Sequence, residues 1–135
     1  MEWYDIGLER GDAWSGANAA WIILNRPVPG LGPRDAALRA AKAAALRDPD
    51  AAAEARDLLA GLPRTVLEGA AQELVNALGG QLQVDDSFGP ASVAELQRVL
   101  TAAGAAAPHS ETSADRLQAL AGAYWTKQKF RVDLY

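Results

Sequence analysis

The side chains best suited to chemistry in this sequence are acidic residues that come in close pairs. Glycoside hydrolysis uses two carboxylates that flank one sugar bond, and the acid of the pair has a raised pKa. The candidate pairs are Glu2 with Asp5, Glu9 with Asp12, and Asp85 with Asp86. Because the chain is acidic, with a net charge of −4, we interpret these carboxylates as solvated surface groups and predict no catalytic residue.

The sequence offers no other catalytic or metal-binding set. His109 is the only histidine, and it stands beside Ser110 without the Gly-x-Ser-x-Gly pattern of a hydrolase nucleophile. With one histidine and no cysteine, multi-histidine and thiolate zinc centres are excluded. Calcium-loop, phosphate-loop and dinucleotide-binding patterns do not occur either. We therefore expect no metal and no cofactor, and we interpret His109 as a solvated loop residue.

Aromatic side chains are the second route to a functional surface. Sugars stack their C–H faces on exposed rings, while neighbouring amides and carboxylates bind the sugar hydroxyls. The candidate ligand-binding residues are Trp3, Tyr4, Trp14, Asn18 and Trp125. In contrast, we expect Trp21 and Tyr124 to lie in the core.

Length and charge exclude several classes of function. A chain of 135 residues suggests a single domain. No run of Lys or Arg occurs, so we expect no nucleic-acid binding. The N-terminal segment is acidic and broken by glycine, unlike a secretory signal or transit peptide, and no apolar stretch approaches the roughly 20 residues that span a bilayer. We expect a soluble protein without membrane insertion. It would be made in the cytoplasm and would reach the cell wall only through another delivery factor.

The elements that must position these side chains are helices. Alanine, leucine, glutamate and arginine dominate the sequence and favour helix. We expect an all-α, compact bundle of about six helices over 1–135, the first of them over 14–25 and the second over 34–46. Asp48 is the predicted N-cap of the third helix, which ends at Gly61.

The later helices carry their own start signals. Thr65 with Glu68 and Thr112 with Asp115 have the spacing of capping boxes. The stretch TAAGAAAPHSETS is the predicted loop before the last helix. The tail KQKFRVDLY is predicted to be a short extended piece.

Two segments share one plan, in which an apolar helix, a Gly-Pro corner and a second helix follow one another. Leu31-Gly32-Pro33 corresponds to Phe88-Gly89-Pro90, which predicts two related halves, about 14–61 and 64–104, followed by a C-terminal helix and tail. Glycine allows close backbone approach, and proline presets the first turn of a helix. The residues interpreted as structural parts of the turns are Gly32, Pro33, Asp85, Phe88, Gly89 and Pro90.

The second corner resembles a known family. Asp85-Asp86-Ser87-Phe88-Gly89-Pro90-Ala91-Ser92 is similar to the Asp-Gly-x-[Phe/Ile]-Gly-Pro-x-Thr turn of three-helix peptidoglycan-binding modules in cell-wall hydrolases. Asp86 stands where the family has glycine, and Ser92 stands where it has threonine. The position of Asp86 often takes a left-handed backbone conformation, which aspartate tolerates less well than glycine.

A wider resemblance covers most of the chain. Segments YDIGLERGDAWSGANAAWIILN, VPGLGPRDAALRA and ADRLQALAGAYWTK resemble the C-terminal predicted peptidoglycan domain of phage-type N-acetylmuramidases, the secretion-activator lysozyme-like proteins. Asp5 and Gly11 match the first motif, and Glu9 replaces its asparagine. The last helix carries Arg116, Tyr124 and Trp125. The Glu-Gly-Gly-Tyr-type catalytic segment of that family does not occur in the sequence.

The resemblance implies a non-catalytic peptidoglycan-binding or accessory module of a wall-hydrolase system. One alternative is a protein–protein interaction component, such as a phage structural protein, an inhibitor or an adaptor, that docks through its aromatic N-terminus and its tail. A divergent muramidase with an unrecognised carboxylate is the third hypothesis. The sequence leaves the partner, peptidoglycan or protein, and the oligomeric state open.

Overall fold

The computed structural model of the chain describes the backbone of residues 1–133 and the side chains of residues 1–128. Every regular element in this part is a helix, which confirms the all-α class. The helices, in chain order, are α1 (Glu2–Glu9), α2 (Ala13–Asn25), α3 (Pro33–Ala44), α4 (Pro49–Ala60), α5 (Arg64–Ala77), α6 (Pro90–Ala102) and α7 (Ser113–Asp133). None of these described helices is both long and apolar enough to cross a membrane.

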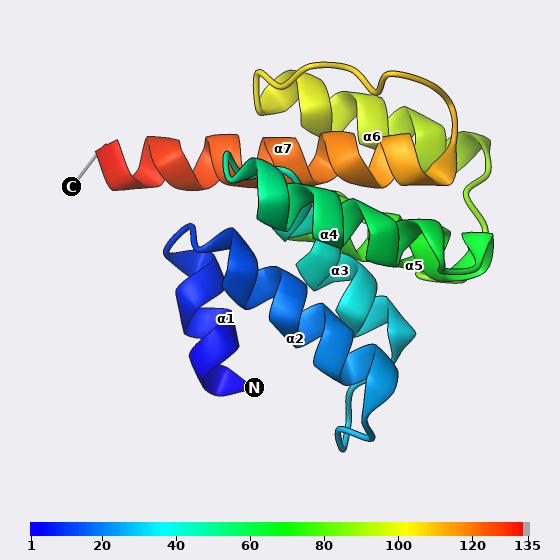
Figure 1. Cartoon of the computed structure of the whole chain (residues 1–135). Helices are drawn as coiled ribbons and strands as arrows, with labels where there is room; N and C mark the ends of the chain where they lie inside the picture. The colour runs from blue at the N-terminus through cyan, green and yellow to red at the C-terminus, as the bar shows by residue number, and fades with distance from the viewer. Residues whose placement is uncertain (134–135) are drawn as a thin grey trace.

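Helix α3 lies at the centre of the molecule and packs against α1, α2, α4, α5 and α7 (Figure 1). Its buried residues are all alanines, namely Ala36, Ala37, Ala40, Ala41, Ala43 and Ala44. Because a methyl group occupies little volume, the neighbouring helices can approach α3 closely. The large, fully buried hydrophobic side chains lie instead on α5, α6 and α7, and they are Leu74, Val75, Val99, Leu117 and Leu120.

Helix α2 turns its small residues toward α3, and the prediction that Trp21 lies in the core is therefore wrong. The buried residues of α2 are Ala13, Gly16, Ala17, Ala19, Ala20 and Ile23, whereas Trp21 is 44% exposed. A Cβ atom at Gly16 would lie 3.0 Å from the Cβ of Ala43 and 3.1 Å from the carbonyl oxygen of Arg39. An indole ring does not fit between helices packed this closely.

Two of the predicted N-caps are confirmed. Asp48 caps α4, because its Oδ1 accepts a hydrogen bond from the N–H of Asp50 at 3.1 Å. Thr112 caps α7, because its Oγ1 accepts a hydrogen bond from the N–H of Asp115 at 3.2 Å. The predicted capping box of Thr65 is wrong, since α5 already begins at Arg64 and no side chain caps it.

Both ends of the chain hold more helix than the sequence patterns predicted. Helix α1 was not expected; Glu2 and Asp5 stand in its first turn, where acidic side chains interact favourably with the helix dipole. The tail KQKFRVDLY was expected to be extended, but α7 continues through Asp133, because the tail itself contains no glycine or proline that would end the helix. Residues 134–135 of that tail lie outside the described residues.

Helix α1 is fastened to the centre by a bidentate ion pair. The guanidinium of Arg39 on α3 donates from Nε to Asp5 Oδ1 at 2.8 Å and from Nη2 to Asp5 Oδ2 at 2.9 Å. Arg39 also donates from Nη1 to the carbonyl oxygen of Asp35, which holds the guanidinium in place. Such paired, parallel hydrogen bonds are among the stronger polar contacts in proteins.

The two Gly-Pro corners have similar backbones. Gly32 (φ −127°, ψ −172°) and Gly89 (φ −89°, ψ −168°) are both extended, and Pro33 and Pro90 are the first residues of α3 and α6. The helix pairs around them differ, because α2 packs extensively on α3, whereas α5 packs mainly on α7 and α3 rather than on α6. The relation between the two halves of the chain stays a prediction.

The close contact between α2 and α3 can be tested by replacing glycine with alanine at two positions, one inside the contact and one outside it. Gly122→Ala in α7 places a methyl group where no atom lies within 4 Å, so we expect it to raise the free energy of unfolding by about 0.5–1 kcal/mol. Gly16→Ala should lower it by about 1 kcal/mol, because overpacking of about 1–3 kcal/mol outweighs the gain in helix propensity. Urea unfolding of both variants measures the difference, and a stabilising Gly16→Ala would contradict the close approach.

Candidate functional site

The loop between α5 and α6 is organised by Gln72, a side chain of α5 that is 1% exposed. Its Nε2 donates hydrogen bonds to Asp85 Oδ1 and to the carbonyl oxygen of Ser87, both at 2.9 Å, and to the Ser92 hydroxyl at 3.2 Å. Its Oε1 accepts hydrogen bonds from the N–H groups of Asp85 at 3.0 Å and Asp86 at 3.1 Å. One amide thus closes the turn that leads into the second Gly-Pro corner.

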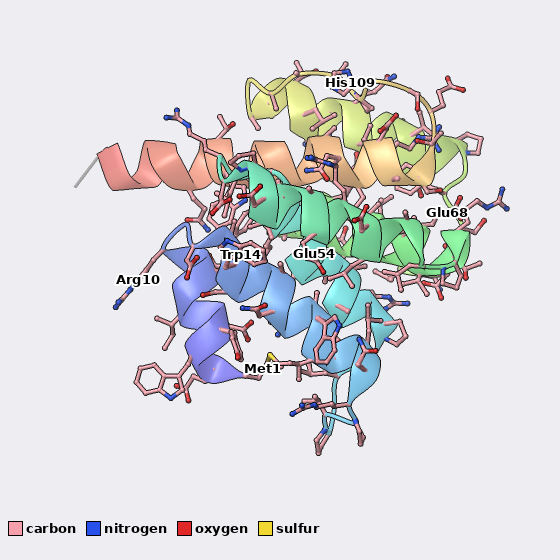
Figure 2. The ribbon with its side chains drawn as sticks, viewed as in Figure 1. Met1, Arg10, Trp14, Glu54, Glu68 and His109 are labelled. Atoms are coloured by element: carbon pink, nitrogen blue, oxygen red, sulfur yellow. The ribbon has the colours of Figure 1, made fainter. Side chains whose placement is uncertain are left out.

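Two more polar side chains of α5 hold the same loop. Glu68, Gln72 and Asn76 follow one another at four-residue spacing, which places them on one face of the helix. Asn76 accepts a hydrogen bond from the N–H of Leu82 at 2.7 Å and donates to its carbonyl oxygen at 2.9 Å. Glu68, near the first turn of α5 (Figure 2), accepts a hydrogen bond from the N–H of Phe88 at 3.4 Å. The loop therefore has fixed partners along much of its length.

Asp86 has a positive φ of 62°, and no other non-glycine residue of the described part does. This is the left-handed conformation that the family's turn often has at this position. Its carboxylate accepts a hydrogen bond from Arg34 Nη2 at 2.6 Å, and Arg34 follows the first Gly-Pro corner. A Cβ atom at Gly69 would lie only 2.0 Å from Asp86 Oδ1 and 2.9 Å from Arg34 Nε. Glycine at position 69 therefore leaves the space in which this ion pair forms.

These contacts give the acidic pair of the loop a structural role. Hydrogen bonds from the Gln72 amide and the Ser87 N–H lower the pKa of Asp85. A general acid of a glycosidase needs the opposite shift, a raised pKa. Asp86 is held by Arg34 in the ion pair described above.

The acidic residues near the N-terminus also join elements of the fold. Glu9 lies 3.5 Å from Lys42 Nζ and accepts a hydrogen bond from the Tyr124 hydroxyl, so it links α1 to α3 and α7. Tyr124, expected in the core, is half-buried and packs against it. Asp12 caps α2, because its Oδ1 accepts a hydrogen bond from the N–H of Trp14 at 3.2 Å.

An exposed stripe of aromatic and amide side chains runs along α2. Trp14, Asn18, Trp21 and Asn25 stand at positions i, i+4, i+7 and i+11, which lie on one side of a helix. Trp14 is 40% exposed and Trp21 is 44% exposed, and both asparagines are exposed. We call these four residues the α2 stripe. Figure 2 shows Trp14 near the start of α2.

The guanidinium of Arg26 lies 6.0 Å from the ring centroid of Trp21. The amide of Asn25 donates from Nδ2 to the carbonyl oxygen of Trp21 at 2.9 Å, and this contact does not use its Oδ1. The α2 stripe thus combines two ring surfaces with hydrogen-bonding groups, the two kinds of contact that a sugar needs.

The other predicted ligand-binding residues belong to other helices than this stripe. Trp3 is 84% exposed and Tyr4 is half-buried, and both belong to α1. Trp125 is an anchor between α7 and α3, because its Nε1 donates a hydrogen bond to the carbonyl oxygen of Lys42 at 2.8 Å. Its ring packs edge-on against Tyr124, with centroids 5.1 Å apart. Of the five candidates, Trp14 and Asn18 share the α2 stripe.

Sequence reasoning missed Trp21 and Asn25 as members of this surface. The available signal was the repeat itself, because a tryptophan and an asparagine recur seven residues after Trp14 and Asn18. That spacing returns each side chain to nearly the same side of a helix.

His109 is exposed in the loop between α6 and α7 (Figure 2). Among the residues that the structure describes, no group of three or more histidine, cysteine, aspartate or glutamate side chains is arranged to hold a metal ion. Comparison of the chain with protein-family models, with curated proteins and with solved structures gives no match.

The role of Gln72 can be tested by removing its amide. Gln72→Ala leaves the N–H groups of Asp85 and Asp86 without their acceptor, so we expect the free energy of unfolding to fall by about 2–3 kcal/mol. Gln97→Ala, at an exposed glutamine of α6, is the matched control and should change it by less than about 0.5 kcal/mol. Equal effects of the two substitutions in urea unfolding would show that Gln72 does not organise the loop.

Proposed function

We propose that the protein is a non-catalytic module that binds peptidoglycan, as an accessory part of a wall-hydrolase system. The observation that carries this proposal is the α2 stripe, in which Trp14 and Trp21 present ring surfaces to solvent. Indole rings can stack on pyranose rings, and the exposed amides of Asn18 and Asn25 can exchange hydrogen bonds with sugar hydroxyl and acetamido groups.

The spacing of the two tryptophans suits a linear glycan strand. Seven residues advance about 10 Å along a helix axis at 1.5 Å per residue, which is comparable to the length of two linked sugar rings. Trp14 and Trp21 could therefore stack on rings that belong to neighbouring repeat units of one strand. Because Asn18 stands between them in the same stripe, its amide lies beside the linkage region of such a strand.

The second corner supports the same assignment by resemblance. The stretch from Asp85 to Ser92 keeps the Phe-Gly-Pro centre of the peptidoglycan-binding turn, and Asp86 adopts the left-handed backbone conformation at the family's glycine position. The hydrogen bonds of Gln72 to Asp85 and of Arg34 to Asp86 give the loop a structural role. Under this proposal the corner shapes the module, α2 binds the glycan, and the chain acts at the cell wall after delivery by another factor.

The test is co-sedimentation with purified sacculi at low and moderate salt. We expect the wild-type chain to sediment with the sacculi without solubilising them. Trp14→Ala and Trp21→Ala should each weaken binding about tenfold, equal to about 1.4 kcal/mol, and the double variant should remain in the supernatant.

Trp3→Ala is the matched control, because Trp3 is the most exposed tryptophan and lies on α1 outside the stripe. It should sediment like the wild type. Circular dichroism confirms that each variant is folded. A wild-type chain that stays wholly in the supernatant rules out peptidoglycan binding, and a double variant that sediments like the wild type rules out the α2 stripe as its site.

A second candidate function, a protein–protein interaction component, is favoured by a groove beside α1. This groove, of about 720 Å³, has apolar walls formed by Met1, Ile6, Val28, Pro29 and Leu31. Ile6 is 38% exposed. An open apolar groove of this kind suits the docking of a second copy of the chain.

Light scattering separates this function from peptidoglycan binding. Self-association that increases with protein concentration, is lost in Ile6→Asp, and is accompanied by no binding to sacculi would support the interaction component. A chain that stays monomeric at all concentrations would contradict it. Of the tail proposed for docking, the structure describes the side chains of Lys127 and Gln128 and the backbone as far as Asp133, and 134–135 lie outside the described residues.

A further inference from the structure

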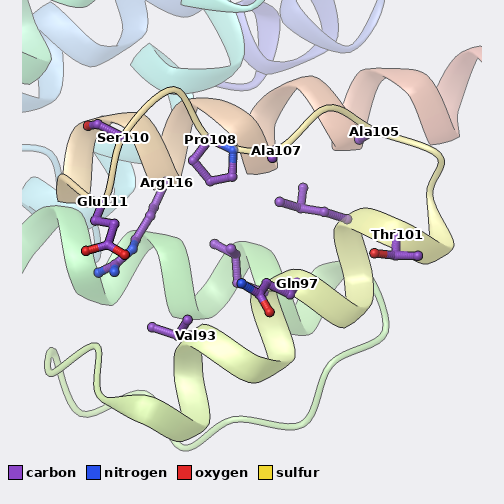
Figure 3. Close-up of a pocket in the computed structure, with 11 residues that line it drawn as sticks. Val93, Gln97, Thr101, Ala105, Ala107, Pro108, Ser110, Glu111 and Arg116 are labelled. Carbon is purple, nitrogen blue, oxygen red and sulfur yellow. The ribbon is translucent and has the colours of Figure 1, made fainter.

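A second surface with binding chemistry lies at the opposite side of the molecule from α2. A cavity of about 460 Å³ opens between α6 and the loop that joins α6 to α7 (Figure 3). Its volume lies within the range of about 300–1,000 Å³ that is typical of small-ligand sites. The cavity is lined by Val93, Leu96, Gln97, Leu100, Thr101, Ala105, Ala107, Pro108, Ser110, Glu111 and Arg116.

The floor of the cavity is apolar and its rim is polar. Val93, Leu96 and Leu100 come from one face of α6, and Pro108 covers them from the loop. Arg116, in the first turn of α7, brings a positive charge to one end of the cavity, as Figure 3 shows. The rim also carries the carboxylate of Glu111. This lining is suited to a ligand that has a small apolar part, an anionic end for Arg116 and N–H donors for Glu111.

Arg116 differs from the other half-buried arginines of the described chain. Arg34 holds Asp86 at 2.6 Å and Arg39 holds Asp5 at 2.8 Å. No hydrogen bond or ion pair joins the Arg116 guanidinium to another described residue. A guanidinium carries five N–H donors in a rigid fork that matches a carboxylate. Arg116 is therefore the half-buried arginine whose binding groups are left for a ligand.

The guanidinium of Arg116 is already oriented. It lies 5.2 Å from the centroid of the Phe88 ring, within the range of a cation–π contact. Phe88 in turn packs against the core and is held through its N–H by Glu68. A binding group that is held in place before the ligand arrives loses less conformational freedom on binding.

We propose that this cavity binds a short peptide with a free C-terminal carboxylate and small apolar side chains. The carboxylate is bound by the guanidinium of Arg116, and the apolar side chains lie on Val93, Leu96 and Leu100. Gln97 and Glu111 at the rim accept hydrogen bonds from the N–H groups of the peptide. This inference does not rest on glycan binding by α2, because the two surfaces share no residue.

The experiment is calorimetric titration of the full chain with N-acetyl-alanyl-alanine and with its C-terminal amide. We expect the carboxylate to bind at least about tenfold more tightly than the amide, and the affinity to fall as salt is raised. Equal affinity for the two peptides, or no binding of either at about 1 mM, would overturn the proposal.

Variants locate the site. Arg116→Gln should abolish the preference for the carboxylate, and Arg56→Gln, at an exposed arginine of α4, should leave it unchanged. Ala107→Trp, at an exposed loop position on the wall, should fill the cavity and weaken both peptides. Retained carboxylate preference in folded Arg116→Gln, or unchanged binding in Ala107→Trp, would contradict the assignment. Sacculus binding of Arg116→Gln is measured alongside, so failure of either proposal is seen separately.

Discussion

The small size of the side chains on α3 is the constraint on which the arrangement of the other helices depends. The buried residues of α3 are alanines, so α2 can approach until Gly16 lies against the backbone of Arg39. Each buried methyl group removes little apolar area from water, and burial energy scales with that area. The leucines and valines of α5, α6 and α7 must therefore supply much of the hydrophobic stabilisation.

This constraint also shapes the surface of α2. Apart from Ile23, the buried residues of α2 are alanine and glycine, and the two tryptophans of the helix are turned outward. The exposure of Trp14 and Trp21 creates the surface to which we assign glycan binding. The packing of the core and the proposed site are thus two results of one helix orientation.

Much of the fold could be predicted from local signals in the sequence. Asp48 and Thr112 were recognised as caps because capping depends on residues within a few positions of the helix start. The outward position of Trp21 was not predicted, because it depends on the size of residues on another helix. Helix α1 was missed for a similar reason, since the ion pair between Asp5 and Arg39 joins residues far apart in the chain. The buried role of Gln72 could not be read from its own neighbours either.

The contact of Arg34, Gly69 and Asp86 makes the residue types at these three positions depend on one another. A side chain at 69 would collide with the ion pair, and a glycine at 86 would leave Arg34 with only the more distant Glu73 at 3.6 Å. Evolutionary drift at any one of these positions is consequently limited by the other two. Descendants of this chain should keep the trio or exchange it together.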